Sequence, residues 1–233
     1  MKTIGLVGGT GWISTVTYYQ LINETINKRL GGLNAAKCVL YSVNFAEIDQ
    51  LKKHNDTSGI FEIILDAATK VINAGADCLL LCANTLHYYA EDLEDRISVP
   101  LIHIANATAK KIKESHISKV GLLGTKKTME QDFYRSKLQD ANVQAIVPDE
   151  KEREFIDNAI MNEFLKGIFK KATKANFLDI IKNLEVQGAE GIILGCTEIP
   201  LIIEQADVKL PVFNTTLIHS LAAVDFALNE DSL

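Results

Sequence analysis

Two segments of this chain, almost half its length apart, carry nearly the same pattern of residues. Residues 75–85 and 188–198 each begin with Gly-Ala and an acidic residue, continue with an apolar run, and end with a cysteine and small polar residues. Such a pattern is typical of a helix that ends at glycine and is followed by a short buried strand. The repeat predicts a duplicated unit with one thiol per copy, Cys82 and Cys196, offset by one residue in a gapless alignment.

Further segments repeat between the two halves, and strands alternate with helices throughout. Residues 119–125 echo residues 2–10, and residues 211–216 echo residues 100–103. The apolar runs predict strands at 4–7, 37–45, 78–81, 101–104, 119–125, 145–147, 191–194 and 211–216, with amphipathic helices between most of them. This alternation predicts an α/β fold whose parallel sheets are flanked by helices.

The duplication favours two sheets over one continuous sheet. We therefore expect two pseudo-symmetric Rossmann-like α/β domains, each a parallel sheet flanked by helices, with the active site between them. The expected boundaries are 1–98 together with 214–233 for one domain and 99–213 for the other. Ligands of such sheets bind at the carboxyl ends of the strands, which is where both cysteines are expected.

Composition excludes several classes of partner. The formal net charge is −6 and the pI is near 5.4, without a dense basic stripe, which argues against nucleic acid. No apolar run approaches the length of a membrane span. Because the first expected strand begins at Ile4, no signal peptide fits before it, and we expect a cytoplasmic protein.

The remaining cysteines, Cys38 and Cys78, lie in or beside strand-like apolar runs. No CxxC pair or cluster of histidines accompanies them, so we expect no metal site and no disulfide. Free thiols packed as small core residues are the ordinary state in a reducing compartment.

Two thiols on opposite sides of a carbon atom would suit the removal and return of a proton. An amino-acid α-proton is a weak acid, and inverting its centre without a cofactor needs a base on one face and an acid on the other. A thiol with a pKa near 8.5 serves either role after modest tuning. The alternative is that Cys82 and Cys196 are buried structural residues, but their repetition favours catalysis.

Polar residues follow each predicted strand end. A strand that turns into a helix leaves backbone N–H groups unpaired, and with neighbouring hydroxyls and amides they can hold a carboxylate. Ordinary helix capping is the alternative, and the two roles are compatible. Glu198 would repel an anion, so a supporting role is favoured for it. The candidate substrate-binding residues at these ends are Thr10, Asn84, Thr85, Thr125, Thr197 and Glu198.

The histidines and lysines give weaker signals. His87, His103 and His219 are candidate bases, but a single histidine is more often a core or capping residue, and that interpretation is favoured. Lys52 follows the second strand and Lys166 lies in the second half, and both are candidates to bind a second carboxylate of the substrate.

With these motifs the chain resembles the aspartate/glutamate racemase superfamily, whose members work without a cofactor and use two cysteines. The segments that carry the resemblance are 4–9, 82–85, 121–125, 128–134 and 194–199. The aspartate racemase and broad-specificity branch matches better than glutamate racemase, which would have Asp-Ser-Gly after the first strand and His in place of Glu198.

The resemblance implies that Cys82 and Cys196 are the paired acid and base and that the protein is a homodimer. It also implies that the substrate is lined by Thr10, Ala83, Asn84, Thr197 and Glu198, with Lys166 on a side-chain carboxylate. Some positions depart from the family pattern. Ala83 replaces a frequent Thr, and no arginine follows the second strand, which weakens the case for strict aspartate specificity.

The leading hypothesis is a cofactor-independent racemase that acts on aspartate or glutamate. A broad-specificity amino-acid racemase, or a maleate isomerase-like enzyme acting on a dicarboxylate, is the alternative on the same scaffold. A catalytically silent module that binds a small carboxylate is a third hypothesis, and the two thiols make it the weakest.

Overall fold

The computed structural model describes residues 1–228, which form two compact units. Unit 1 comprises Met1–His103 and the described residues from His219 on, and unit 2 comprises Ile104–Ile218. Residues 229–233, which the sequence assigns to the first domain, lie outside the described residues.

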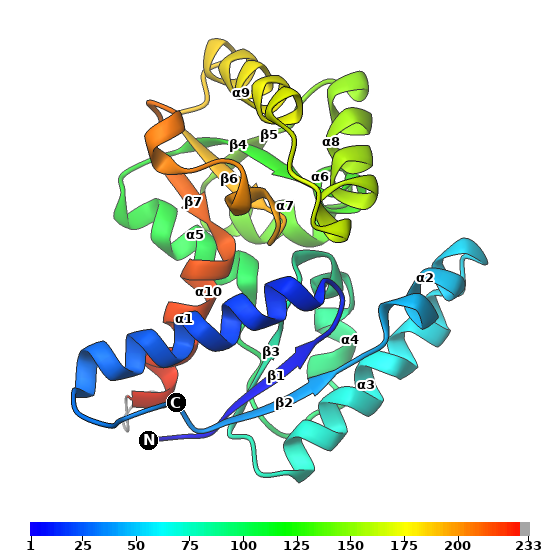
Figure 1. Ribbon diagram of the computed structural model, residues 1–233, viewed down its shortest axis with the longest axis vertical. Coiled ribbons are helices and arrows are strands. Elements are labelled where there is room, and N and C mark those ends of the chain that lie inside the picture. The colour runs from blue at the N-terminus through cyan, green and yellow to red at the C-terminus, as the bar shows by residue number, and fades with distance from the viewer. Residues whose placement is uncertain (229–233) are drawn as a thin grey trace. The chain divides into compact units, whose positions relative to one another are not determined.

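Unit 1 is built on a three-stranded parallel sheet in the order β2-β1-β3 (Figure 1). The strands are β1 (Ile4–Gly8), β2 (Cys38–Ser42) and β3 (Cys78–Leu81). The helices are α1 (Trp12–Leu30), α2 (Phe45–Lys53), α3 (Thr57–Asn73), the 3-10 helix η1 (Asn84–Tyr89) and α4 (Ala90–Glu94).

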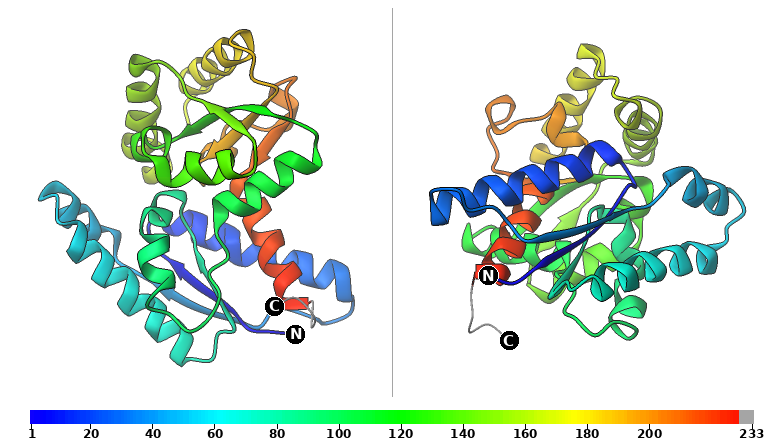
Figure 2. Two further views of the ribbon diagram at one scale, coloured as in Figure 1. Left: turned by 180° about the vertical axis from the view of Figure 1, so that it is seen from behind. Right: turned by 60° about the horizontal axis from the view of Figure 1, so that its bottom comes forward.

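Alternate residues of β1 and β3 enter two different cores, as expected of a strand buried on both faces. Val7, Leu79 and Leu81 pack with the apolar face of α3, whereas Leu6 and Leu80 pack with α1. Figure 2 shows α1 and α3 on opposite faces of this sheet. The layers match the flanked parallel sheet expected from the sequence.

The predicted strand at 101–104 is mostly wrong. Only a single parallel bridge joins Leu101 to Leu79, through hydrogen bonds from Leu79 N to Pro100 O (3.0 Å) and from Ile102 N to Leu79 O (2.9 Å). The strand stops there because helix α5 (Ile104–Glu114) begins two residues later.

Unit 2 is built on a four-stranded parallel sheet in the order β5-β4-β6-β7. The strands are β4 (Lys119–Gly124), β5 (Gln144–Ile146), β6 (Gly191–Gly195) and β7 (Val212–Asn214). Besides α5, the helices are α6 (Lys126–Glu130), α7 (Asp132–Asp140), α8 (Glu150–Asn162), α9 (Lys171–Val186) and the 3-10 helices η2 (Phe164–Lys166), η3 (Ile199–Leu201) and η4 (Gln205–Asp207). Helices α8 and α9 share one core with β4 and β6, while α5 and α7 share the other.

The acidic residue of each repeat has the same structural role in both units. Asp77 Oδ2 accepts a hydrogen bond from Thr3 N (2.6 Å), just before β1, and Glu190 Oε2 accepts one from Ser118 N (2.8 Å), just before β4. In each unit the carboxylate therefore holds the start of the neighbouring strand. Gly75 and Gly188 precede these residues with φ of 95° and 91°, the left-handed geometry of a glycine that ends a helix.

Each half of the chain contributes one helix to the core of the other half's sheet. Helix α5 follows the Leu101 bridge of unit 1 but packs into the core of unit 2 through Ile104 and Ile112. Helix α10 (Thr215–Leu228) follows β7 of unit 2, and Ala223 and Val224 pack into the core of unit 1. Burying a side chain such as Val224 completely is worth about 1.5–3 kcal/mol, so this exchange contributes to the stability of both units.

The fold class predicted from the sequence, two parallel sheets flanked by helices, is confirmed. Within residues 1–228, none of the helices combines the length and the apolar character that crossing a membrane requires.

Candidate active site

In unit 1, Cys82 is the first residue after β3, beside the carboxyl end of β1. Its backbone N–H donates to Val7 O at 2.9 Å, which continues the parallel ladder by one residue. The side chain is 2% exposed and packs in the core that contains α1 and α10. Burial, with a smaller contribution from Cys38, raises the pKa of the Cys82 thiol well above its usual range, so the thiol is protonated at neutral pH.

The turn after β1 lies at the same edge of the sheet as Cys82. Gly9 has φ of 99°, and a Cβ there would collide with the backbone of Val43, so only glycine fits. Gly9 N donates to Thr15 Oγ1 at 2.9 Å, which fixes the turn. The hydroxyl of Thr10 is buried and finds no hydrogen-bond partner within residues 1–228. A buried hydroxyl without a partner is rare in native proteins and is a natural contact for a ligand.

The residues after Cys82 lead directly into η1. Ala83 is extended, with φ of −154° and ψ of 138°, and Asn84 is the first residue of the 3-10 helix. Ala83 and Asn84 are buried, and Thr85 is half-buried. Thr10, Cys82, Ala83, Asn84 and Thr85 therefore follow adjacent strands at one edge of the unit 1 sheet, as the sequence predicts.

Unit 1 also contains a cluster of three buried histidines that the sequence did not reveal as a cluster. The ring of His87 lies 4.8 Å from that of His103 and 5.5 Å from that of His219, measured between centroids. All three are buried, as expected if each is a core residue. No local sequence pattern indicates that the three rings lie together, since the three positions are far apart in the sequence.

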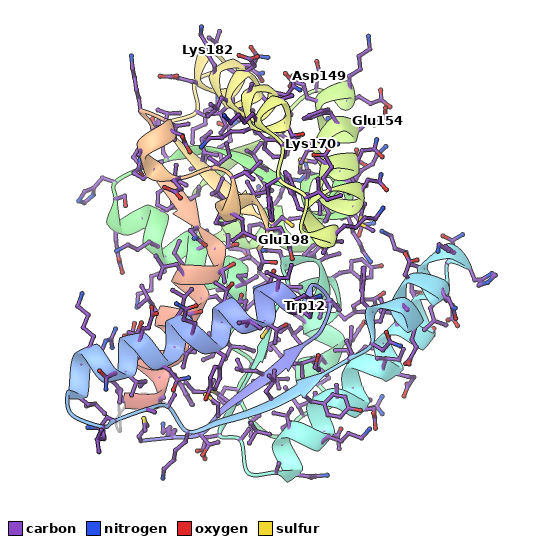
Figure 3. All side chains as sticks on the ribbon, viewed as in Figure 1. Trp12, Asp149, Glu154, Lys170, Lys182 and Glu198 are labelled. Atoms are coloured by element: carbon purple, nitrogen blue, oxygen red, sulfur yellow. The ribbon has the colours of Figure 1, made fainter. Side chains whose placement is uncertain are left out.

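In unit 2, Cys196 is the first residue after β6 and is hydrogen-bonded to a carboxylate. Its Sγ–H donates to Glu198 Oε2 at 3.0 Å, and the Thr197 hydroxyl donates to the same oxygen at 2.8 Å. Cys196, Thr197 and Glu198 are all buried, with Glu198 only 2% exposed. Glu198 is labelled in Figure 3, beyond the end of β6.

The surroundings of Cys196 favour its protonated form. Burial raises the pKa of its thiol well above the usual range, and the negative charges of Glu198 and of Asp157 raise it further. Asp157, on α8, is held by the backbone N–H of Lys126, which donates to its Oδ1 at 2.8 Å. No sequence pattern indicates a role for Asp157. Glu198, two residues from Cys196, could be recognised as a neighbour from its position alone.

Thr125 and Gly195 lie at the carboxyl ends of β4 and β6 in unit 2. Gly195 pairs with Gly124, and a Cβ on Gly195 would lie 2.7 Å from Leu123 O, so the strands approach closely here. The Thr125 hydroxyl accepts a hydrogen bond from Thr128 N at 3.3 Å and caps α6. Thr125 therefore caps a helix, which is one of the two roles considered from the sequence. Thr10 does not cap α1, whose N-cap residue is Gly11.

The two candidate lysines lie at the surface of their units. Lys52 is in the last turn of α2, and Lys166 is the last residue of η2, just before Gly167 with φ of 71°. Both side chains are exposed. Their role toward a substrate stays a prediction.

The other two cysteines, Cys38 and Cys78, are free thiols. Burial raises the pKa of Cys38 to about 11 and that of Cys78 to about 12, so both are neutral thiols. Within residues 1–228, His, Cys, Asp and Glu side chains form no group of three or more that could hold a metal ion.

Comparison with known proteins identifies the family. The model of the Asp/Glu/hydantoin racemase family matches residues 7–223. The broad specificity amino-acid racemase RacX of Bacillus subtilis is 23% identical over 223 residues, which cover 91% of this chain and 92% of that protein.

Solved structures agree over nearly the whole chain. A candidate Asp/Glu racemase from Yersinia pestis is 45% identical with a TM-score of 0.91, covering 98% of this chain and 100% of that one. An aspartate racemase homologue from Pyrococcus horikoshii is 35% identical with a TM-score of 0.85 and the same coverage. The chain therefore belongs to the Asp/Glu/hydantoin racemase family and is an amino-acid racemase.

Proposed function

We propose that the protein racemises an amino acid without a cofactor, with Cys82 and Cys196 acting on opposite faces of the α-carbon. One observation carries the proposal: each unit presents a buried thiol as the first residue after a buried strand, and the thiol of Cys196 is hydrogen-bonded to the carboxylate of Glu198. A thiol paired with a proton acceptor is the arrangement that acid–base catalysis by cysteine requires.

The proposed reaction moves one proton in and one proton out. The thiolate of one cysteine takes the α-proton, and the C–H electron pair stays on the substrate as a carbanion stabilised by its carboxylate. The thiol of the other cysteine then donates its proton to the opposite face. The product has the inverted configuration, and the two cysteines have exchanged protonation states. After the product leaves, Cys82 takes a proton from water and Cys196 releases one, and the enzyme is ready for another turnover in the same direction.

Glu198 has a defined part in this proposal. Both thiols are neutral in the free enzyme because burial raises their pKa, so one of them must lose a proton before it can act as a base. Glu198 Oε2 already accepts the hydrogen bond of the Cys196 thiol and can take that proton, giving a thiolate beside a carboxylic acid. Cys82 then begins as the acid and Cys196 as the base.

The polar residues at the strand ends would hold the substrate. We propose that the Thr10 hydroxyl, whose buried oxygen has no partner among the described residues, donates to the substrate's α-carboxylate. Ala83, Asn84, Thr85, Thr125, Thr197 and Glu198 are proposed to line the substrate, with Lys52 or Lys166 at its far end.

Aspartate and glutamate are the first substrates to test, on the family membership. A wider range is the second candidate, favoured by the similarity to a racemase described as broad in specificity. We also propose that the protein is a homodimer, as the family resemblance implies, and that it is cytoplasmic.

The test is incubation of the purified protein in deuterium oxide, without pyridoxal phosphate or added metal, with a panel of acidic, neutral and basic L-amino acids. We expect α-hydrogen exchange and formation of the D-isomer for at least one of them. An absence of exchange across the whole panel would overturn the proposal.

Cysteine variants then test the mechanism. Cys82→Ser and Cys196→Ser should each lower racemisation by about 10²–10⁴-fold, because one face then lacks its proton carrier. Cys38→Ser is the matched control and should change the rate far less, since Cys38 is the first residue of β2, at the end of the unit 1 sheet opposite to Cys82, and makes only the smaller contribution to the Cys82 pKa. Full activity in either of the first two variants would refute the two-thiol mechanism.

A further inference from the structure

The buried histidine cluster of unit 1 is attached to the backbone next to Cys82. His87, in η1, is 1% exposed, and its Nδ1 lies 3.0 Å from the carbonyl oxygen of Ala83. A carbonyl oxygen only accepts hydrogen bonds, so Nδ1 must carry the proton and donate it. The bond connects His87 to the residue that directly follows the Cys82 thiol.

The neighbouring ring is fixed in the opposite tautomer. His219 Nε2 lies 2.6 Å from Ile102 O, so Nε2 carries the proton and donates. The Nδ1 atom of the same ring, 2.8 Å from Tyr18 Oη, then accepts from the tyrosine hydroxyl. Burial lowers the pKa of His219 to about 3 and that of His87 well below its usual range, so both rings are neutral near pH 7.

These contacts leave the His87 ring little freedom. It packs against the His103 ring at an interplanar angle of 61° and against the His219 ring at 67°, both edge-on. His219 is held in turn by Tyr18 and Ile102. Edge-to-face packing of this kind, inside a buried region, holds a ring in one orientation.

Holding the Ala83 carbonyl has a consequence for the thiol. A peptide unit is planar, so fixing the carbonyl of Ala83 also fixes the direction of the Asn84 N–H, which points the opposite way. On its other side, Cys82 is fixed by the hydrogen bond from its own N–H to Val7 O at 2.9 Å. The backbone is thus anchored on both sides of the thiol, by β1 and by His87.

We propose that His87 is a positioning residue for the Cys82 thiol: through its Nδ1–H it holds the Ala83 carbonyl, and the packed rings of His103 and His219 keep it in that orientation. The proposal rests on the proposed function, since it assumes that Cys82 transfers a proton. A displacement of a reacting group by about 1 Å can cost about 10²-fold in rate, so loss of this anchor should reduce turnover more than binding.

Two substitutions separate the hydrogen bond from the ring. The amide nitrogen of asparagine is attached to Cγ, as Nδ1 is in histidine, so His87→Asn keeps a donor for the Ala83 carbonyl. Glutamine places its amide near the Nε2 position, so His87→Gln loses that donor while filling more of the space. His54→Gln, at an exposed residue of the same unit, is the control for the substitution itself.

The experiment measures kcat, KM and the melting temperature of the wild type and the three variants on the amino acid that exchanges fastest. We expect His87→Gln to lower kcat by about 10–100-fold with KM changed less than about threefold, and His87→Asn to restore most of kcat. Equal kcat for His87→Gln and His87→Asn, or a loss that follows melting temperature alone, would overturn the proposal.

A second measurement does not depend on activity. Long-range ¹H–¹⁵N correlation spectra of the wild type should show the His87 ring neutral and protonated at Nδ1, and an Nε2–H tautomer would overturn the proposal even if His87→Gln fails to fold. A wild type that racemises no amino acid removes the proposed function and this inference together. An active wild type with an unaffected His87→Gln removes the inference alone.

Discussion

Lowering the pH from 8 to 5 should destabilise the protein through its buried histidines. His219 has an ordinary pKa of 6.5 in the unfolded chain, and burial lowers it to about 3 in the folded protein, with the charge of His87 contributing less. Between these two values the unfolded chain binds a proton that the folded protein does not. The free energy of unfolding therefore rises with pH in this window and falls as acid is added.

The magnitude follows from the two pKa values. Each pH unit below 6.5 costs about 1.4 kcal/mol per histidine, so at pH 5 His219 alone removes about 2 kcal/mol relative to pH 8. His87, whose pKa is also lowered mainly by burial, acts in the same direction. The loss from His219 alone is a sizeable part of the 5–15 kcal/mol by which a typical domain is stable.

Between pH 8 and pH 5, the carboxylates with lowered pKa values contribute little to the change in the free energy of unfolding. Glu163, Glu190 and Asp207 have lowered pKa values because hydrogen bonds favour their charged forms, so they lose stability only when the pH falls further. Above pH 5 the histidines dominate the slope.

The assay is urea unfolding followed by circular dichroism at several pH values, for the wild type and for His219→Gln. Glutamine keeps a donor near Nε2 for Ile102 O but does not titrate, so the stability difference between pH 8 and pH 5 should shrink by about 2 kcal/mol. An identical pH dependence for wild type and His219→Gln would refute the reasoning.

Two further predictions concern the proposed active site. Glu198→Gln should lower the pKa of Cys196, because a negative charge that raises it is removed, and the pH dependence of Cys196 alkylation checks this. The same variant should reduce kcat by about 10²–10⁴-fold, because the proton acceptor is removed. Steady-state kinetics measure this loss, and an unchanged kcat would exclude the role given to Glu198. Thr10→Val should leave the melting temperature unchanged or raise it, since the buried hydroxyl has no partner among residues 1–228, but should weaken substrate binding by about 10–100-fold; calorimetric titration with the substrate checks this, and unaltered affinity would contradict it.

Much of the fold could be predicted from local patterns. Strands β1, β3, β4 and β6 are short apolar runs buried on both faces, and such runs have a strong signal. Helix α2 has a weak sequence signal, because Ile48 is its single buried residue and little apolar periodicity results. Helices α6 and α7 are separated at Gln131, whose backbone is extended.

The site was predictable only where the chemistry repeats in the sequence. Cys82 and Cys196 were found because each follows a duplicated strand, and the structure has both directly after their strands. The histidine cluster was missed because His87 meets His219 only through tertiary packing, after α10 has entered the core of unit 1. The difference between Thr10 and Thr125 was also hidden, because whether a threonine caps a helix depends on the backbone that follows it.

The duplicated scaffold carries two thiols whose surroundings are not duplicated. In unit 1 the pKa of Cys82 is raised by burial, and the neighbouring backbone is anchored by a neutral histidine. In unit 2 two carboxylates, Glu198 and Asp157, add to the effect of burial on Cys196, and one of them is hydrogen-bonded to the thiol.

If the two thiols had equivalent surroundings, neither would be favoured as the first base. The carboxylate of Glu198 favours Cys196, because the thiol proton can move to it directly without passing through solvent. Among the groups that raise the pKa of Cys82 there is no carboxylate. The two enantiomers of an amino acid have equal free energy, so kcat/KM must be the same in both directions, and the asymmetry can appear only at saturation. It therefore predicts unequal kcat values for the L- and D-substrates, each matched by a proportional difference in KM, because the two thiols have different surroundings. Equal kcat values for the two directions would be incompatible with this assignment, because the carboxylate is hydrogen-bonded to only one of the two thiols.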